Sequence, residues 1–324
     1  MRAIVVDHWT EPRDLKVQQI AEPELRPGAV QVEVKAAGCN FFDILIVRGQ
    51  YQVKPPFPFI PGSELAGIVR AVGEGVEDFA PEDQVYGGVP LGAFAERAVV
   101  PGLMLRSLPR GMSFEEAAGL PIVYPTSYVG LVQRTSLQPG ETLLVHAAAG
   151  GVGIAAVQIG KALGAHVIAT AGGSKKLEVA RQAGADLVID YHDASWIDAV
   201  KQATDGRGAD VIYDPVGGDV FDGSLKCIAW NGRLLTVGYA GGRIPEVKVN
   251  RILLKNIAVI GLHWGAYAVK QPEVVRATFD ALTRLYEQGK IAPVVYRSYP
   301  LEAVPEALEA LASRRTYGKV IITP

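Results

Sequence analysis

The sequence predicts an α/β protein in which a doubly wound parallel sheet is combined with a second unit of short antiparallel strands. The hydrophobic pattern changes near Glu141, from short alternating apolar runs to apolar strands that alternate with helical segments. A glycine-rich stretch follows the first of these later strands. The chain has 324 residues, which is long for one small core, so two domains are expected.

Composition narrows the classes of partner and compartment. The formal net charge is -2 and no Lys/Arg-rich run occurs, so neither nucleic acid nor an anionic membrane is expected as a partner. Two cysteines cannot form a disulfide framework, and the N-terminus alternates like a strand instead of resembling a signal peptide. We therefore expect a cytoplasmic protein. The uncharged run at 142–160 is interpreted as a strand, a turn and a helix, not as a membrane span.

The predicted elements follow this pattern in order. Residues 1 to about 121 contain short runs split by Gly and Pro, such as "VQVEVKAAG" and "AGIVRAVGEGV", and predict an antiparallel sheet or small barrel. Six parallel strands are then expected at "TLLVHA", "HVIAT", "LVIDY", "DVIYD", "LLTVG" and "AVIGL", with helices between them. Helices "PEVVRATFDALTRLYEQG" and "LEAVPEALEALASRR" precede a last strand, "GKVIITP". The predicted domains are 1–123 with 265–324, and 124–264.

The glycine-rich stretch predicts a dinucleotide site. Ala148, Gly150 and Gly153 stand at the spacing of GxGxxG, with Ala in the first place, between a predicted strand and a predicted helix. Small residues are needed there because the backbone turns tightly and approaches a pyrophosphate at the helix N-terminus. A tight βα turn without a ligand is the alternative. We expect the dinucleotide to contact the residues of the turn, which are Ala148, Gly150, Gly151, Val152 and Gly153.

The end of the second parallel strand favours NADP(H) over NAD(H). An NAD site places Asp or Glu there to bind the ribose hydroxyls, but Thr170 and Ala171 supply no carboxylate. The following residues Gly172, Ser174 and Lys176 offer a turn, a hydroxyl and a cation that suit a 2′-phosphate. The alternative is a solvated helix start with ordinary lysines.

Together these stretches resemble the medium-chain dehydrogenases/reductases, and among them the zinc-independent NADPH:quinone oxidoreductases, over essentially the whole chain. The matching segments are "AAGCNFFD", "PGSELAGIVRAVGEGV", "LPIVYPTSYVGL", "VHAAAGGVGIAAVQIGKALGAHVIATAG", "DPVGG" and "GRLLTVG". The resemblance implies a GroES-like β-barrel catalytic domain and a Rossmann domain that binds NADPH. It also implies a homodimer that pairs the last Rossmann strand, near "AVIGLHW".

No metal is expected. The zinc-containing relatives place a ligand Cys where this chain has Asn40, so that Cys39 stands one residue too early. They place a ligand His where this chain has Ser63. Two cysteines cannot supply a four-Cys structural zinc site. Cys39 is interpreted as a small, partly buried apolar residue, and a nucleophilic role is the alternative.

The catalytic candidates are hydrogen-bond donors. Hydride transfer to a conjugated carbonyl compound spreads charge onto an oxygen, which one or two donors can stabilise without a metal. Asn40 and Tyr51 are such donors, and related enoyl-thioester reductases have a functional Tyr at the position of Tyr51. Asp43 belongs to the same family pattern. Tyr51 could instead be a barrel-surface aromatic, and Asp43 a turn or cap residue.

The resemblance adds further cofactor residues. Thr126 matches a Thr at the nicotinamide end, although it could simply cap the helix that is predicted in "SYVGLVQR". Tyr191 and Arg314 match positions that hold the 2′-phosphate and its ribose. Gly238 ends the matching segment "GRLLTVG" and is expected to bind the cofactor. The segment with His263 and Trp264 is expected to approach the nicotinamide, while Trp264 could equally belong to a dimer core.

The expected function is NADPH-dependent hydride transfer to quinones or related conjugated carbonyl compounds without zinc. The first alternative is an enoyl-thioester or enone reductase, for which Arg13, Arg48 and Lys54 are the obvious cations that could bind a CoA. The second is a non-catalytic NADPH-binding protein. Sequence alone leaves these open.

Overall fold

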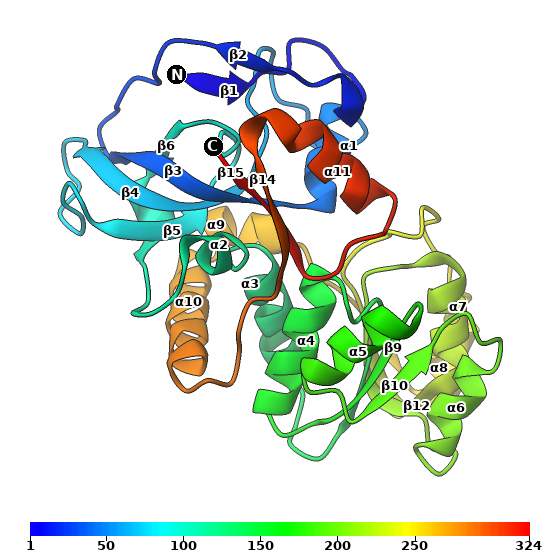
Figure 1. Ribbon diagram of the computed structural model, residues 1–324. Coiled ribbons are helices and arrows are strands. Elements are labelled where there is room, and N and C mark those ends of the chain that lie inside the picture. Colours follow the sequence, from blue (N-terminus) through cyan, green and yellow to red (C-terminus); the bar gives the residue numbers. More distant parts are fainter. The chain divides into compact units, whose positions relative to one another are not determined.

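The computed structural model describes residues 1–324 as two compact units (Figure 1). The first unit is 1–122 with 293–324, and the second is 123–292. The chain thus returns to the first unit at Pro293, later than the predicted 265. Helix α10 (Pro272–Glu287) accounts for the difference, because it packs against α3 (Val123–Tyr128) of the second unit.

The first unit is built on a seven-stranded sheet in the order β14-β15-β3-β4-β5-β7, with β6 also paired to β3. All pairs are antiparallel as predicted, except that β14 and β15 are parallel. Its core is apolar and includes Val30, Val32 and Leu65. The elements are β1 (Arg2–Ile4), η1 (Pro12–Asp14), β2 (Val17–Gln19), β3 (Ala29–Cys39), α1 (Phe41–Val47), β4 (Glu64–Val72), β5 (Gln84–Gly88), β6 (Arg97–Pro101), η2 (Gly102–Met104), β7 (Leu105–Ser107), α2 (Phe114–Ala118), β14 (Val295–Pro300), η5 (Leu301–Ala303), α11 (Val304–Ala312) and β15 (Lys319–Thr323).

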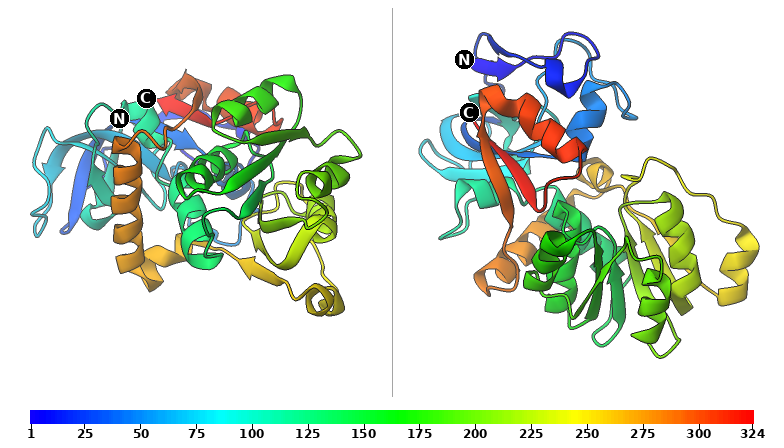
Figure 2. Two further views of the ribbon diagram at one scale, coloured as in Figure 1. Left: turned by 90° about the horizontal axis from the view of Figure 1, so that it is seen from below. Right: turned by 45° about the vertical axis from the view of Figure 1, so that its right-hand side comes forward.

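The second unit is a six-stranded parallel sheet in the order β10-β9-β8-β11-β12-β13, as predicted. The order reverses between β8 and β11, where such folds bind ligands at the carboxyl ends of the strands. Helices connect the strands of this sheet and lie next to it, as both views of Figure 2 show. Besides α3 and α10, the elements are η3 (a π-helix, Val129–Arg134), β8 (Thr142–Val145), α4 (Gly151–Ala162), β9 (His166–Ala171), α5 (Ser174–Gln182), β10 (Leu187–Asp190), α6 (Trp196–Gln202), β11 (Ala209–Asp214), α7 (Gly218–Cys227), β12 (Ile228–Thr236), α8 (Val249–Lys255), β13 (Ala258–Gly261), η4 (Trp264–Ala266) and α9 (Tyr267–Lys270).

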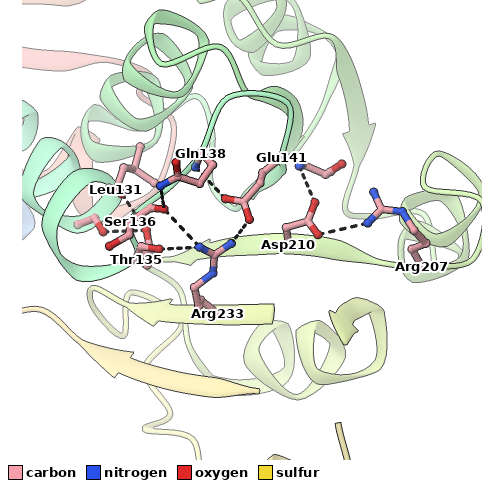
Figure 3. A network of polar contacts seen from close by, with 10 residues as sticks. Leu131, Thr135, Ser136, Gln138, Glu141, Arg207, Asp210 and Arg233 are labelled. Carbon is pink, nitrogen blue, oxygen red and sulfur yellow. Dashed lines mark hydrogen bonds and ion pairs between the residues drawn. The ribbon is translucent and has the colours of Figure 1, made fainter. Parts of the chain in front are cut away.

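A polar network ties together the amino-terminal side of this sheet (Figure 3). Arg233 of β12 pairs with Glu141 and donates to the carbonyl of Thr135 at 2.8 Å. The carboxylate of Asp210 accepts from the backbone N–H of Thr142 at 2.8 Å. These contacts fix the loop that leads into β8 at the end of the sheet opposite the glycine-rich turn.

The long uncharged run is a strand, a turn and a helix, as the sequence predicts. Residues 142–160 form β8, the glycine-rich turn and most of α4. No helix in the protein combines the length and the apolar character needed to cross a membrane.

Candidate active site

The glycine-rich turn has the geometry that dinucleotide binding requires. Ala148 donates its backbone N–H to the carbonyl of Thr170 at 2.9 Å, which ties the turn to β9. A Cβ on Gly153 would lie 2.2 Å from the carbonyl oxygen of Ala147, so only glycine allows α4 to approach the strand this closely. Gly150 is the N-cap of α4 and supplies no side-chain cap. The first-turn N–H groups, which begin at Gly151 and Val152, are therefore left for an anion.

A buried histidine, His146, precedes this turn and links β8 to neighbouring elements through hydrogen bonds. His146 immediately follows β8, and its two ring nitrogens lie 2.9 Å from the hydroxyl oxygens of Thr170 and Ser224. Burial lowers the pKa of His146 to about 3, so the ring is neutral at physiological pH. A neutral imidazole has one donor and one acceptor nitrogen, and a hydroxyl can match either. This role of His146 was not predicted from the sequence.

The end of β9 brings several predicted residues together. Gly172 faces the side chain that follows β10, since a Cβ on Gly172 would lie 2.6 Å from the hydroxyl of Tyr191. Helix α5 begins here with Ser174 and has Lys176 in its first turn. The carboxylate of Asp190 accepts from the N–H of Gly173 at 3.0 Å. The structure thus gathers Gly172, Ser174, Lys176 and Tyr191 around the end of β9. The strand itself ends without a carboxylate, and that of Asp190 is bound to the backbone that follows it.

Other predicted cofactor residues lie elsewhere. Thr126 is buried and is the fourth residue of α3. It therefore lies within a helix that has already begun, and the alternative that it caps the following helix is wrong. Gly238 follows β12, and a Cβ at this position would lie 3.5 Å from the carbonyl oxygen of Pro215. His263 and Trp264 follow β13, and the ring of Trp264 stacks on Tyr267. Arg314 belongs to the first unit and has a left-handed backbone, φ 56°.

In the first unit, Asn40 and Asp43 meet at the start of α1. Asn40 is the N-cap residue, and its backbone N–H donates to the Asp43 carboxylate at 2.7 Å. The Asn40 side chain does not cap the helix. Its Nδ2 donates to Glu64 at 2.8 Å, and its Oδ1 accepts from Lys319 at 2.8 Å. Asn40 is only 9% exposed.

The other candidates of this segment differ in their surroundings. Burial raises the pKa of Asp43 to about 7, and one of its carboxylate oxygens has no hydrogen-bond partner. Burial also raises the pKa of the Cys39 thiol, which lies in the core and fits the predicted role of an apolar residue better than that of a nucleophile. Tyr51 is partly buried. Its ring lies edge-on to that of Phe42, with 4.5 Å between the two ring centroids.

Glu64 and Lys319 were not predicted as parts of this site. Their side chains are 2.6 Å apart and almost completely buried. The available signal was a charged residue directly before each of two apolar runs, in "ELAGIV" and "KVIIT". Such charges are rarely buried unless they are paired. No group of three or more His, Cys, Asp or Glu side chains in the protein has an arrangement that could hold a metal ion.

A GroES-like unit and a parallel sheet with a glycine-rich first turn define a medium-chain dehydrogenase/reductase. Two family models match, the alcohol dehydrogenase GroES-like domain at 26–110 and the zinc-binding dehydrogenase at 151–284. The quinone oxidoreductase-like protein 2 homolog of Nematostella vectensis is 40% identical over 99% of this chain and 88% of its own. The chain belongs to the quinone oxidoreductase family of this superfamily.

Two solved structures are similar over nearly their full length. Escherichia coli quinone oxidoreductase complexed with NADPH has a TM-score of 0.92 and 33% identity, with all of both chains covered. CurK enoyl reductase has a TM-score of 0.90 and 26% identity, covering 99% of this chain and 98% of its own. The protein is therefore an oxidoreductase by family.

Proposed function

We propose that the protein is an NADPH-dependent reductase that transfers hydride to quinones or related conjugated carbonyl compounds without zinc. The observation that carries the proposal is the buried amide of Asn40, a hydrogen-bond donor at the position where zinc-containing relatives have a ligand Cys. Ser63 stands at the second ligand position. The NADPH complex of the similar E. coli enzyme supports the choice of cofactor.

The residues of the second unit suit NADPH. The uncapped start of α4 and the close approach at Gly153 suit a pyrophosphate. Ser174, Lys176 and Tyr191 suit a 2′-phosphate, and Arg314 of the first unit is also proposed to bind the cofactor. Thr126, His263 and Trp264 are proposed to contact the nicotinamide half, and Gly238 is proposed to contact the cofactor. When bound, the nicotinamide supplies the hydride.

The first unit supplies the polar groups for the acceptor. A conjugated acceptor that receives hydride develops negative charge on its carbonyl oxygen, and preorganised donors stabilise that charge. The amide of Asn40 and the phenol of Tyr51 are proposed to be these donors. Asp43 keeps Asn40 at the start of α1 by accepting its backbone N–H.

Reduction of an enoyl-thioester or an enone is the second candidate, because the CurK enoyl reductase shares the fold over nearly the whole chain. A CoA ester would need cations near the acceptor. Of the three cations that the sequence offers, Arg48 pairs with Glu11 at 2.6 Å, and the ammonium of Lys54 lies 6.0 Å from the ring centroid of Trp9. Two of the three cations, Arg48 and Lys54, are thus engaged within the first unit, which supports acceptors without a CoA group.

Kinetics with a panel of quinones, enones and enoyl-CoAs tests the proposal. We expect NADPH oxidation with quinones and enones, and Tyr51→Phe should lower kcat by about tenfold to a thousandfold, the scale of losing one oxyanion donor. The loss should be larger for enones, because quinones are intrinsically more reactive towards hydride.

Tyr296→Phe is a matched control, because this Tyr of the same unit packs its ring on Tyr317 and no catalytic role is proposed for it. NADPH titration checks that both variants still bind cofactor. No turnover with any acceptor would instead support a non-catalytic NADPH-binding protein. An unchanged kcat in Tyr51→Phe would make Tyr51 a surface aromatic.

A further inference from the structure

A buried ion pair connects two distant parts of the first unit. Glu64 begins β4 and Lys319 begins β15, the last strand of the chain. The side chain of Glu64 is 0% exposed and that of Lys319 is 4% exposed. Desolvation makes such a pair a weak source of stability, and apolar residues of similar size often stabilise a core equally well. The pair therefore calls for an explanation beyond stability.

Apart from one bond to Ile122, the hydrogen bonds that this pair makes to the rest of the protein all go to Cys39 and Asn40. The Lys319 ammonium donates to Glu64 at 2.6 Å, and to Asn40 Oδ1 and the carbonyl of Cys39 at 2.8 Å each. One oxygen of Glu64 accepts from Asn40 Nδ2, and the other accepts from the backbone N–H of Ile122 at 2.9 Å. Every strong donor and acceptor of the pair is thus used.

This arrangement permits only one orientation of the Asn40 amide. An ammonium group can only donate and a carboxylate can only accept, so Oδ1 must face Lys319 and Nδ2 must face Glu64. A flipped amide would point its N–H groups at the ammonium and its oxygen at the carboxylate. The amide has two N–H bonds, and Glu64 accepts only one of them. The direction of the second N–H is fixed by the same two contacts.

The surroundings leave little room for the cluster to relax. A Cβ on Gly38 would lie 2.4 Å from a Glu64 carboxylate oxygen and 2.5 Å from the carbonyl oxygen of Ala118. A Cβ on Gly119 would lie 3.1 Å from the Lys319 side chain. Close packing on both sides therefore holds the two charged groups, and through them the amide, in one place.

We propose that Glu64 and Lys319 are positioning residues that lock the Asn40 amide, so that its second N–H is held ready for the carbonyl oxygen of the acceptor. The proposal rests on the proposed function, because it assigns that N–H to the acceptor. It explains why charges are kept in a core, and why the final strand matters to a residue 279 positions earlier.

A double-mutant cycle tests this. Removing one charge would leave the other buried and unpaired, so we use the combined variant Glu64→Gln/Lys319→Met, which keeps side-chain volume and leaves no lone charge. We expect kcat with an enone to fall by about tenfold to a hundredfold, the scale of a misplaced catalytic group, with the Kd for NADPH changed less than about twofold. In an Asn40→Ala background the same pair of substitutions should cause no further loss of kcat.

Glu33→Gln/Arg70→Met is the matched control, because it removes a partly exposed ion pair with a distance of 2.6 Å from the same sheet, together with the contacts of Glu33 to Lys35 and of Arg70 to Glu82. We expect its kcat to equal that of the wild type. A purely structural role for Glu64 and Lys319 would lower kcat by the same factor with or without Asn40. That additive outcome would overturn the proposal.

A spectroscopic measurement separates this inference from the proposed function. The side-chain amide resonances of Asn40, identified by their absence in Asn40→Ala, should show slow exchange with water in the free protein. In Glu64→Gln/Lys319→Met they should shift and exchange faster. If the wild type reduces no acceptor, the proposed function fails while these resonances still report on the lock. Resonances that are unchanged in the variant would refute the lock itself.

Discussion

At the scale of single residues, Asp43 is a buried carboxyl group near the candidate site with a strongly raised pKa. It is completely buried, and only one of its two carboxylate oxygens has a partner. Burial raises its pKa from 3.8 to about 7, although the N–H of Asn40 and the charge of Lys319 act in the opposite direction. The folded protein therefore binds a proton at this carboxyl group at pH values where the unfolded chain has released it.

The sign of the resulting pH dependence follows from this. The stabilising contribution of Asp43 is fully present below about pH 4 and is lost as the pH rises to about 7, with an upper limit of about 4 kcal/mol. Asp43→Asn cannot titrate, so we expect the variant to gain stability relative to the wild type across this range. Urea unfolding at a series of pH values measures the difference, and parallel curves for the two proteins would contradict the raised pKa.

Some residues of the site could be predicted from sequence and others could not, for a physical reason. Asn40 and Asp43 lie three positions apart in one short segment, where a local pattern can reveal them. Glu64 and Lys319 are 255 positions apart, and nothing local indicates that they pair. Such a pair becomes visible only when β4 and β15 are placed on either side of β3.

At the scale of elements, two glycines of the glycine-rich turn, Gly150 and Gly153, have different roles. A Cβ on Gly153 would lie 2.2 Å from the carbonyl oxygen of Ala147 and 2.7 Å from the Cα of Ala148, and both of these are backbone atoms. A Cβ on Gly150 would meet only the Ala147 carbonyl oxygen, at 3.3 Å. Gly153 is therefore needed for the packing of the fold. Gly150 is not needed for packing, and we assign it to ligand binding.

Two single substitutions test this division. Gly153→Ala should lower the free energy of unfolding by about 1–3 kcal/mol or more, because overpacking forces the backbone to shift. Gly150→Ala should change stability by less than about 1 kcal/mol, but should weaken NADPH binding because its methyl group faces the expected pyrophosphate. Urea unfolding and fluorescence titration with NADPH give the two quantities. Equal stability losses in both variants would contradict the division.

Helix α3 shows where element prediction from sequence is least certain. The pattern predicts a helix in "SYVGLVQR", but the helix already begins at Val123 and continues as a π-helix over Val129–Arg134. Pro125 lies in the first turn, where a backbone N–H has no partner within the helix, so it does not prevent helix formation. A proline that looks like a boundary in the sequence is in fact inside the helix.

At the scale of the whole molecule, the six parallel strands could be predicted because each is an apolar run followed by a helical period. The position at which the chain returns to the first unit could not be predicted in this way. The pattern of α10 shows that one of its faces is apolar, but it does not say which unit covers that face. Contact with α3 decides this, and moves the return from 265 to Pro293.

The parallel sheet also has an open edge. Strand β13 pairs with β12 on one side only, and α8 buries none of its residues. Leu253 and Leu254 on α8 are 74% and 68% exposed, which is unusual for adjacent large apolar side chains. An unpaired strand edge is suited to pairing with another copy of the chain, and the exposed apolar helix α8 directly precedes this strand in the sequence. We therefore predict a homodimer that uses this edge.

Light scattering coupled to gel filtration should give twice the chain mass of 34.6 kDa for the wild type. Leu253→Asp/Leu254→Asp would bury four charges in a symmetric interface, so we expect this variant to be a monomer at micromolar concentration. Leu103→Asp is the matched control, because Leu103 is 69% exposed but lies in the first unit, far along the chain from β13. A wild type that elutes as a monomer, or a double variant that remains a dimer, would exclude this edge as the interface.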